Sequence, residues 1–454
     1  MKFLSWKNNK FSIFKITIFK FRCTNKLKIY FLNILLIKFD NKFCKINSKI
    51  NSNENLDVKI FDNEISLLFD IKLKNNLKIN KNKIAFLATR LYDTGGHTKC
   101  LKDLVESLSD NYKMNVFLTD LSLSRKIAPK SIHEISKFAK IDGIDADFFL
   151  YKRRFKKLIY QIINSEPILL FIFIHPCDVI SCAVISKLKK QTNIKLVFYN
   201  HSSHCPNLAM SFAKIILEGN ILTEKITNEK RGFKNTYVIG LQSKRINETK
   251  YYSNCEISKK KIEIGVYPKN FLTMSGGTSH KFFEKNDSPY FRMIKNLLNR
   301  EPLLKHVIIS EFDNTQKKII KKIFENEDFL LKKIIFIDLQ TSFDFYFQCA
   351  DVFIDSFPIS SALTQVDLMR NKVASVVKIN NKNPEYSFHE YQKPNYKYMF
   401  SDTKEMELAI LDLLYNAKKR QILINENYEY WLKKYEFNVV KEKYLNFINN
   451  IILE

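Results

Sequence analysis

Apolar residues of this chain gather into two successive series of short runs from residue 83 onward. The first series covers residues 83–89, 114–120, 167–175 and 194–201, and its runs show little alternation with polar residues. Such runs are typical of strands that are buried on both faces of a parallel sheet. Segments with apolar residues at helical spacing lie between them, as in KCLKDLVESL after the first run. The pattern predicts alternating strands and helices.

A second series of runs with the same character begins near residue 271. It continues with HVIIS, KIIFIDL, CADVFID and VASVVKI, and helical stretches such as YFRMIKNLLN and EMELAILDLLYNA lie between or after these runs. Two blocks of strand and helix alternation predict an α/β protein with two Rossmann-like domains facing a cleft. The cleft between two such domains is the expected ligand site.

Residues 240–270 separate the two series, because this stretch has little apolar periodicity. We therefore expect a hinge there, with an N-terminal Rossmann-like domain over 83–255 and a C-terminal one over 256–430. A C-terminal helix is expected over 431–454. The length of 454 residues exceeds the size at which one hydrophobic core stops growing, which agrees with two domains and extensions.

Residues 1–82 form a small basic extension with a different pattern. Its segments KFSIFKITIFKF (10–21) and KIYFLNILLIKF (28–39) alternate apolar and basic residues. Residues 1–83 hold 18 Lys and Arg against 6 Asp and Glu, so that +12 of the net charge of +27 lies in this part. Two interpretations stay open: a module that lies on an anionic membrane surface, or a small β appendage packed on the main fold with solvated lysines.

Two features of composition bear on the cellular location. The longest uncharged stretch near the N-terminus, residues 29–37, is far shorter than the ~20 residues that span a bilayer. We therefore expect a protein that is neither secreted through a plain signal nor transmembrane. The eight cysteines are scattered, without a CxxC pair or the spacing of a zinc site. They indicate reduced thiols in the cytoplasm and no bound metal.

The net charge of +27 favours an anionic partner, namely a nucleic acid, an anionic membrane surface or a phosphorylated small molecule. A nucleic-acid-binding protein would show basic residues interleaved with aromatic ones, or a recognisable recognition helix. The sequence shows neither, so we expect no nucleic acid as a partner. A nucleic-acid-binding protein is kept as the less favoured alternative.

Two glycine pairs stand out because the chain has only nine glycines. Gly95-Gly96 and Gly276-Gly277 each follow a predicted strand. Glycine there permits a positive φ and a close approach of the backbone, and the amides of the following helix start can bind an anion. Lys281, five residues after Gly276, could place a positive charge over a bound phosphate. Ordinary tight turns use glycine equally well.

Four histidines fall at the C-terminal ends of predicted parallel strands, the edge at which doubly wound folds bind ligands. They are His97, His175, His201 and His204. A histidine there can act as a base or donate a hydrogen bond to an anion. A single histidine is more often structural or solvated, but four at one edge favour a functional role for at least one.

Five segments together resemble the GT-B glycosyltransferases over roughly residues 84–430. The closest likeness is to bacterial enzymes of glycan assembly and, in the C-terminal block, to the O-GlcNAc-transferase type. The segments are TGGHTK (94–99), HPCD (175–178), FYNHSSH (198–204), SGGTSHKF (275–282) and ADVFIDSFPISSALTQVDLM (350–369).

The resemblance implies a nucleotide-sugar donor held mainly by the C-terminal domain, an acceptor held mainly by the N-terminal domain, and no obligatory metal. It implies that Asp367 binds the ribose hydroxyls, that Thr364 binds the diphosphate, and that Lys281 neutralises the charge of the diphosphate. The turn SFPISSALTQ would then hold the diphosphate with helix-start amides and with the hydroxyls of Ser360, Ser361 and Thr364. Alternatively, this Ser/Thr-rich turn is only an N-cap and needs no ligand.

Some positions depart from the family pattern. Family members usually carry a Gly-rich or His-Thr-Thr sequence where this chain has Ala362, Leu363 and Thr364, and a glycine where it has Lys372. The paired glutamates of many retaining GT-B enzymes are missing, because the position eight before Asp367 holds an isoleucine. This disfavours a retaining mechanism of that type and leaves an inactive member of the fold as an alternative.

The hypothesis is a cytoplasmic, metal-independent glycosyltransferase of the hexosyltransferase type in polysaccharide biosynthesis. It would move a sugar from a nucleotide diphosphate sugar, with UDP as the expected nucleotide, to a glycan, lipid-linked or protein acceptor. The donor is a substrate, and no cofactor is expected.

Either stereochemical outcome is open, with inversion favoured, and an inverting reaction needs a base for the acceptor proton. His97 is the first candidate and His201 the second. The basic extension would hold the enzyme as a peripheral protein on the inner face of the membrane. A non-catalytic GT-B-like accessory or binding subunit is the main alternative.

Overall fold

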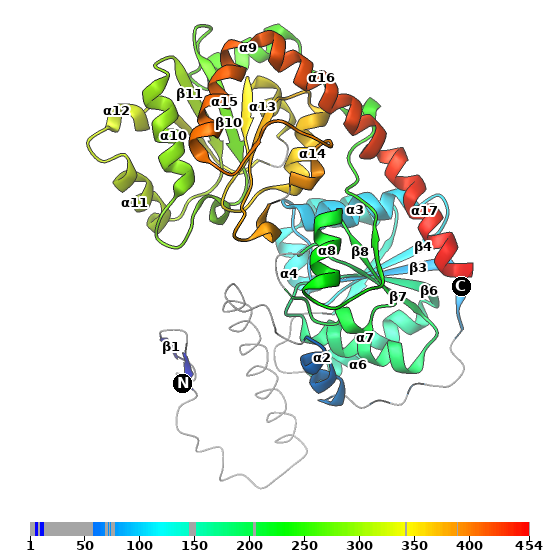
Figure 1. The fold of residues 1–454 in the computed structure, drawn as a ribbon. Helices are drawn as coiled ribbons and strands as arrows, with labels where there is room; N and C mark the ends of the chain where they lie inside the picture. Colours follow the sequence, from blue (N-terminus) through cyan, green and yellow to red (C-terminus); the bar gives the residue numbers. More distant parts are fainter. Residues whose placement is uncertain are drawn as a thin grey trace.

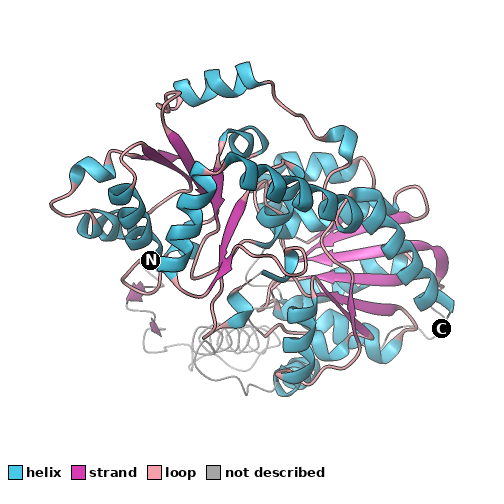
Figure 2. Cartoon of the chain, turned by 45° about the horizontal axis from the view of Figure 1, so that its top comes forward, coloured by secondary structure: helices cyan, strands magenta, loops and turns pink. Residues whose placement is uncertain are grey.

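The computed structural model describes two α/β units, each built on its own parallel sheet (Figure 1). The described residues are 5–7, 10–12, 58–68, 71, 73, 78–144, 151–202, 206–340, 343–387 and 389–453. In both units helices lie on the two faces of the sheet (Figure 2). The predicted fold class of two Rossmann-like units is confirmed.

The N-terminal unit contains a sheet of seven parallel strands in the order β5-β4-β3-β6-β7-β8-β9. Its strands are β3 (Asn80–Ala88), β4 (Lys113–Leu118), β5 (Lys140–Gly143), β6 (Pro167–Phe173), β7 (Lys195–Tyr199), β8 (Ile215–Glu218) and β9 (Thr236–Val238). Its helices are α3 (Gly96–Leu108), α4 (Leu121–Ile127), α5 (Pro129–Ser136), α6 (Tyr151–Asn164), α7 (Val179–Gln191) and α8 (Ile221–Glu229). Every residue of the central strand β6 is buried, as its unbroken apolar run predicts.

The C-terminal unit contains a sheet of six parallel strands in the order β12-β11-β10-β13-β14-β15. Its strands are β10 (Phe271–Gly276), β11 (Leu304–Ile309), β12 (Ile334–Ile337), β13 (Val352–Ile354), β14 (Ser375–Lys378) and β15 (Met399–Phe400). Its helices are α9 (Asn254–Glu263), α10 (Pro289–Arg300), α11 (Asn314–Ile323), α12 (Asp328–Leu331), α13 (Asp344–Cys349), α14 (Ala362–Arg370) and α15 (Thr403–Tyr415). The strand order reverses beside β10 here and beside β3 in the other unit, and such switch points are where open α/β sheets bind ligands.

The chain crosses between the two units twice. The first crossing runs from β9 to α9, within the stretch 240–270 that the sequence marks as the hinge. The second is the junction between α16 (Ala417–Lys434) and α17 (Phe437–Leu453), so the segment 431–454 contains the end of one helix and the whole of another. Helix α17 returns to the N-terminal unit and packs against its core (Figure 1).

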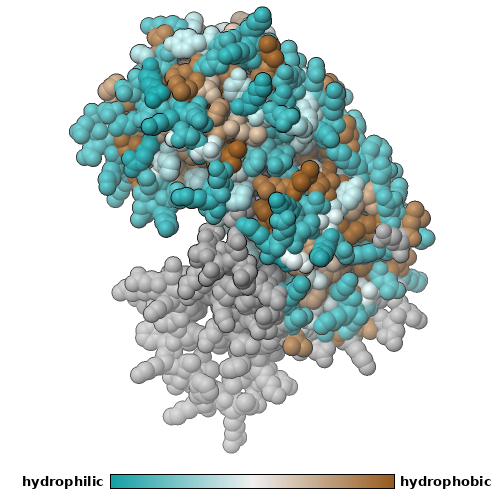
Figure 3. All heavy atoms as spheres, in the orientation of Figure 1, coloured by the Kyte–Doolittle hydropathy of each residue, from teal (hydrophilic) through white to brown (hydrophobic). Residues whose placement is uncertain are grey.

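The two crossings lie side by side. The backbone amide of Ser243 donates to the carbonyl of Tyr435 at 2.9 Å, and Gln242 Nε2 donates to the carbonyl of Phe437 at 3.0 Å. An apolar cluster next to them joins α14 and α16 to residues of the N-terminal unit. Hydrophobic residues are also seen at the surface where the two units meet (Figure 3). These contacts fix how the two sheets face each other.

The basic extension is described only in part. Strands β1 (Ser5–Lys7) and β2 (Lys10–Ser12) form an antiparallel hairpin, and α2 (Val58–Leu68) packs on α7. The rest of the segments 10–21 and 28–39 lies outside the described residues. Among the helices that are described, none is both long enough and apolar enough to cross a bilayer.

Candidate active site

The turn after β10 forms one side of the candidate site. Gly277 adopts a φ of +149°, and its amide donates to the carbonyl of Ile309 at 3.1 Å. A Cβ atom at Gly277 would lie 3.4 Å from the Oγ of Ser361 and 3.6 Å from the Cδ of Lys281. These distances are ordinary van der Waals contacts, so the positive φ is what favours glycine at this position. The preceding residue of the pair, Gly276, is the last of β10.

Lys281 joins this turn to the start of α14. Its Nζ donates to the Oγ of Ser361 at 2.8 Å and to the carbonyl of Ser360 at 3.1 Å. Burial lowers the pKa of Lys281 to about 8, and the nearby carboxylate of Asp355 opposes that shift. The side chain therefore remains mostly charged at neutral pH.

The polar turn between β13 and α14 wraps around a carboxylate of the chain itself. Asp355 is fully buried, and its Oδ1 accepts from the amides of Ser356 at 2.9 Å and Ser361 at 3.3 Å. The hydroxyl of Ser360 donates to its Oδ2. Burial raises the pKa of Asp355 to about 6, against the lowering effects of Ser360 and Lys281. The carboxylate organises the turn by holding its donors.

These hydrogen bonds change the role expected from the sequence for the serine hydroxyls of this turn, because both hydroxyls already have partners within the chain. The hydroxyl of Ser360 already donates to Asp355, and Ser361 already receives the Lys281 amine. Ser361 is the N-cap residue of α14, yet its side chain makes no capping hydrogen bond. The first-turn amides of α14, where Thr364 lies, therefore lack a side-chain acceptor and are suited to an anion.

Asp367 lies one turn further along α14 and is oriented by a buried arginine. Its Oδ1 accepts from Nη2 of Arg370 at 3.2 Å, and Arg370 is only 1% exposed. Arg370 also donates to Asp344, which accepts from Lys244 at 2.9 Å in the first crossing segment. Although burial raises the pKa of Asp344, Arg370 and Lys244 hold it well below its usual range. The network ties α14 to the hinge.

The residue after α14 supports the alignment with the family pattern. Lys372, where family members carry glycine, adopts a φ of +56°. That left-handed conformation is the usual one for a glycine that ends a helix. The backbone therefore keeps the glycine-type turn although the side chain differs.

His97 lies in the first turn of α3, on the N-terminal side of the site. Its Nε2 donates to the carbonyl of Phe173, at the end of β6, at 2.8 Å. Its Nδ1 is buried and has no hydrogen-bond partner among the described residues. Burial lowers the pKa of His97 to about 4, with a raising effect from the Phe173 carbonyl and a lowering one from His175. The ring is neutral at pH 7, and no described group donates to the Nδ1 lone pair.

The structure brings together three of the four histidines that the sequence places at this sheet edge. The ring centroids of His97 and His201 are 4.3 Å apart, and those of His97 and His175 are 5.7 Å apart. The fourth, His204, lies outside the described residues. No group of three or more His, Cys, Asp and Glu side chains within the described residues is arranged to hold a metal ion.

The starts of α3 and α14 face each other across the junction of the units (Figure 1). A Cβ at Gly96 would lie 2.8 Å from Cδ1 of Leu363, so glycine permits this approach, while Gly95 has a φ of +114°.

The charge of Lys99 on α3 also interacts with the carboxylate of Asp367 on α14. Burial lowers the pKa of Lys99, but the charges of Asp103 and Asp367 outweigh that effect and raise it above its ordinary value.

Sequence reasoning missed three residues that shape the site, namely Asp355, Arg370 and Asp344. A signal existed for Asp355, which directly follows a buried strand and opens a turn rich in serine. The pairing of Arg370 with Asp344 joins α14 to α13 and leaves no local pattern in the sequence.

No family model matches the sequence, and no curated protein sequence is significantly similar to it. Solved structures are similar in fold. HepE of Anabaena, in complex with UDP and glucose, superposes with a TM-score of 0.64 at 14% identity over 81% of this chain and 99% of that one. The chain has the GT-B fold.

Two other structures that resemble this chain in fold are those of proteins named as transferases. The O-GlcNAc transferase of Thermobaculum terrenum has a TM-score of 0.58 at 11% identity, over 87% of this chain and 72% of that one. The lipopolysaccharide outer core galactosyltransferase WaaB has a TM-score of 0.55 at 13% identity, over 81% of this chain and 99% of that one. The fold therefore agrees with the resemblance that the five sequence segments indicate.

The low pKa of His97 predicts a pH dependence of stability. Its folded-state pKa of about 4 lies below the ordinary 6.5, so its contribution is complete above pH 6.5 and is lost as pH falls toward 4. We expect this loss to reach about 2–3 kcal/mol in the wild-type chain. Urea unfolding at pH 7 and pH 4.5 should show a smaller loss in His97→Asn than in the wild type.

The exposed His133 of α5 provides the control for this measurement. His133→Asn should keep the wild-type difference between the two pH values. An equal pH dependence in His97→Asn and the wild type would contradict the buried, neutral state of His97.

Proposed function

We propose that this protein transfers a sugar from a nucleotide diphosphate sugar, with UDP as the nucleotide, to a hydroxyl of a glycan, lipid-linked or protein acceptor. One observation carries the proposal. A half-buried lysine and an uncapped helix start converge on one side of the junction, opposite a neutral histidine whose Nδ1 has no hydrogen-bond partner among the described residues. The lysine and the helix start suit the binding of a diphosphate, and the histidine suits the removal of a proton from an acceptor.

The donor would lie on the C-terminal unit. Gly276 and Gly277 let the backbone approach the diphosphate, and Lys281 with the first-turn amides of α14 would offset its charge. Thr364 would add a hydroxyl, and Asp367 would accept hydrogen bonds from the ribose. These groups would let the diphosphate leave without a metal ion.

The acceptor would approach from the N-terminal unit. In an inverting reaction, the acceptor oxygen bonds to the anomeric carbon while the bond from that carbon to the diphosphate breaks. The diphosphate keeps the electron pair, and Nδ1 of His97 takes the acceptor proton. A neutral ring is the state that this step requires. His201 is adjacent and is the second candidate.

The similar structures support the choice of nucleotide. The HepE structures contain UDP, UDP with glucose, or UDP-glucose, and WaaB is a galactosyltransferase. By analogy we place this chain in polysaccharide biosynthesis in the cytoplasm. Its basic extension, residues 1–82, would associate peripherally with the inner face of the membrane.

A non-catalytic accessory subunit is the second candidate function. The observation that favours it is the engagement of the Ser360 hydroxyl by Asp355, together with apolar Ala362 and Leu363 at the start of α14. Such a subunit would keep the fold without productive donor binding. Calorimetry with UDP, GDP and their sugars separates the two candidates, because the absence of heat with every nucleotide favours the accessory role.

Turnover is the direct test of the proposed function. Purified protein incubated with a panel of nucleotide sugars should hydrolyse or transfer at least one UDP-sugar. His97→Gln should lose most of that turnover and keep its affinity for UDP, because the base acts on the acceptor and not on the nucleotide. Full turnover in His97→Gln would remove this residue from the mechanism.

Removal of the positive charge at the diphosphate should weaken nucleotide binding. Lys281→Met should bind UDP about 10- to 100-fold more weakly, which corresponds to the loss of a charged hydrogen bond of about 1.5–3 kcal/mol. Isothermal calorimetry measures the change. Lys285→Met, a substitution of an exposed lysine four residues further on, serves as the matched control. Equal affinities in the two variants would place the diphosphate elsewhere.

The ribose assignment has a test of its own. Asp367→Asn should weaken binding of UDP by about 1–3 kcal/mol and leave binding of inorganic pyrophosphate unchanged, because the carboxylate contacts only the sugar of the nucleotide. Calorimetry with both ligands measures this contrast, and Asp412→Asn on α15 is the control. A parallel loss for both ligands would show that Asp367 acts through the structure of α14.

A further inference from the structure

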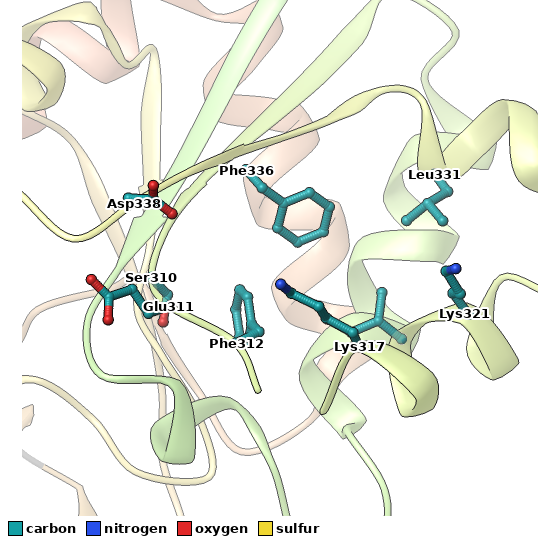
Figure 4. Close-up of a pocket in the computed structure, with 9 residues that line it drawn as sticks. Ser310, Glu311, Phe312, Lys317, Lys321, Leu331, Phe336 and Asp338 are labelled. Atoms are coloured by element: carbon teal, nitrogen blue, oxygen red, sulfur yellow. The ribbon is translucent and has the colours of Figure 1, made fainter. Parts of the chain in front are cut away.

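A pocket of about 440 Å³ lies in the C-terminal unit (Figure 4). The helices α11 and α12 beside it lie at the end of this unit that is away from the N-terminal unit (Figure 1). It is formed by the loop after β11, by α11 and α12, and by the edge strand β12. Phe312 and Ile320 in its lining belong to the apolar cluster on the α10 and α15 face of the sheet. Leu368, from the helix that carries Asp367, belongs to the cluster on the opposite face. The sheet therefore separates this pocket from the proposed ribose contact.

The lining of the pocket is aromatic and aliphatic. Phe312 and Phe336 meet edge to face with ring centroids 5.8 Å apart, and Ile320 and Leu331 complete the apolar part. Phe336 is 45% exposed although it belongs to a strand. Phe312 is buried, so Phe336 is the phenyl ring that an occupant would cover, and its burial by an apolar group would be favourable.

Two lysines border the pocket on one side. Lys317 and Lys321 are one turn apart on α11, both are exposed, and neither side-chain amine forms a hydrogen bond or ion pair with another described residue. In Figure 4 the Lys317 amine lies toward the space between Phe312 and Phe336. An anionic group on an apolar body would satisfy both features of the pocket at once.

Two carboxylates lie at the other side of the pocket, at the ends of the strands. Glu311 follows β11 and Asp338 follows β12, and the Glu311 carboxylate points away from the two rings in Figure 4. They would repel an anion from that side. The negative group of an occupant is therefore directed toward the lysines of α11.

The surface around the pocket has the same mixed character. Phe329 on α12 is 59% exposed. Further exposed lysines lie nearby at positions 318, 322 and 332. Apolar side chains set among lysines are typical of surfaces that lie on anionic membranes. The chain as a whole carries a net charge of +27, which agrees with such a partner.

We propose that this pocket takes an acyl chain of an anionic membrane lipid, whose single phosphate is bound by Lys317 and Lys321. The site lies outside the proposed donor contacts and would hold the C-terminal unit against the membrane surface. It does not depend on transferase activity, so it stands or fails separately from the proposed function.

Photo-crosslinking locates the lipid directly in the full chain. Vesicles would carry phosphatidylglycerol with a diazirine in its acyl chain, and the adducts would be mapped by peptide mass spectrometry. We expect adducts within residues 310–338. The double variant Lys317→Glu with Lys321→Glu should reduce them at least tenfold, whereas Lys418→Glu, an exposed site on α16, should not.

The same experiment can overturn the proposal. Adducts only outside 310–338 would assign lipid binding to another part of the chain, such as the basic extension. Equal labelling by phosphatidylcholine that carries the same diazirine would show that the lysines select no anion. Labelling of the double variant at the wild-type level would also show that the two lysines select no anion. Displacement of the lipid by millimolar inorganic phosphate alone would indicate an anion site without an acyl chain.

Discussion

The candidate site depends on one buried carboxylate. Asp355 holds the amides of Ser356 and Ser361 and the hydroxyl of Ser360, and its charge helps to keep the half-buried Lys281 largely protonated. Without it, the two amides and the Ser360 hydroxyl would be buried and unsatisfied, at about 1–3 kcal/mol apiece. The same bonds present the start of α14, with no side chain over its first amides, to the junction between the units.

The two crossings of the chain determine which residues of the N-terminal unit lie opposite the start of α14. The paired crossing segments, the Lys244 bond to Asp344 and the apolar cluster around α14 and α16 hold the two sheets in one relation. Gly96 then lies against Leu363, and His97 follows immediately. The proposed diphosphate contacts of one unit and the proposed base of the other are held together by these contacts, and the return of the chain to its first unit through α17 adds to them.

Burial lowers the pKa of one residue in each half of the site, but the resulting charge states at neutral pH differ. It lowers the pKa of both Lys281 and His97, but Lys281 has a carboxylate beside it, whereas His97 has a backbone carbonyl and another histidine. The lysine therefore remains a cation and the histidine becomes a neutral acceptor. Environments that separate the charge states of neighbouring groups in this way are characteristic of acid–base sites.

The sequence by itself determined the two-sheet fold, the glycine turns and the gathering of histidines at one sheet edge. Buried parallel strands leave unbroken apolar runs, and strand ends in such a sheet meet at one edge. Short strands such as β8 and β9, with only four and three residues, gave no comparable signal. Only the tertiary structure decided three hydrogen bonds of the site. The Ser360 hydroxyl donates to Asp355, Arg370 donates to Asp367, and Nε2 of His97 donates to the carbonyl of Phe173, 76 residues away. Those partners are chosen by packing between distant segments, which local periodicity does not encode.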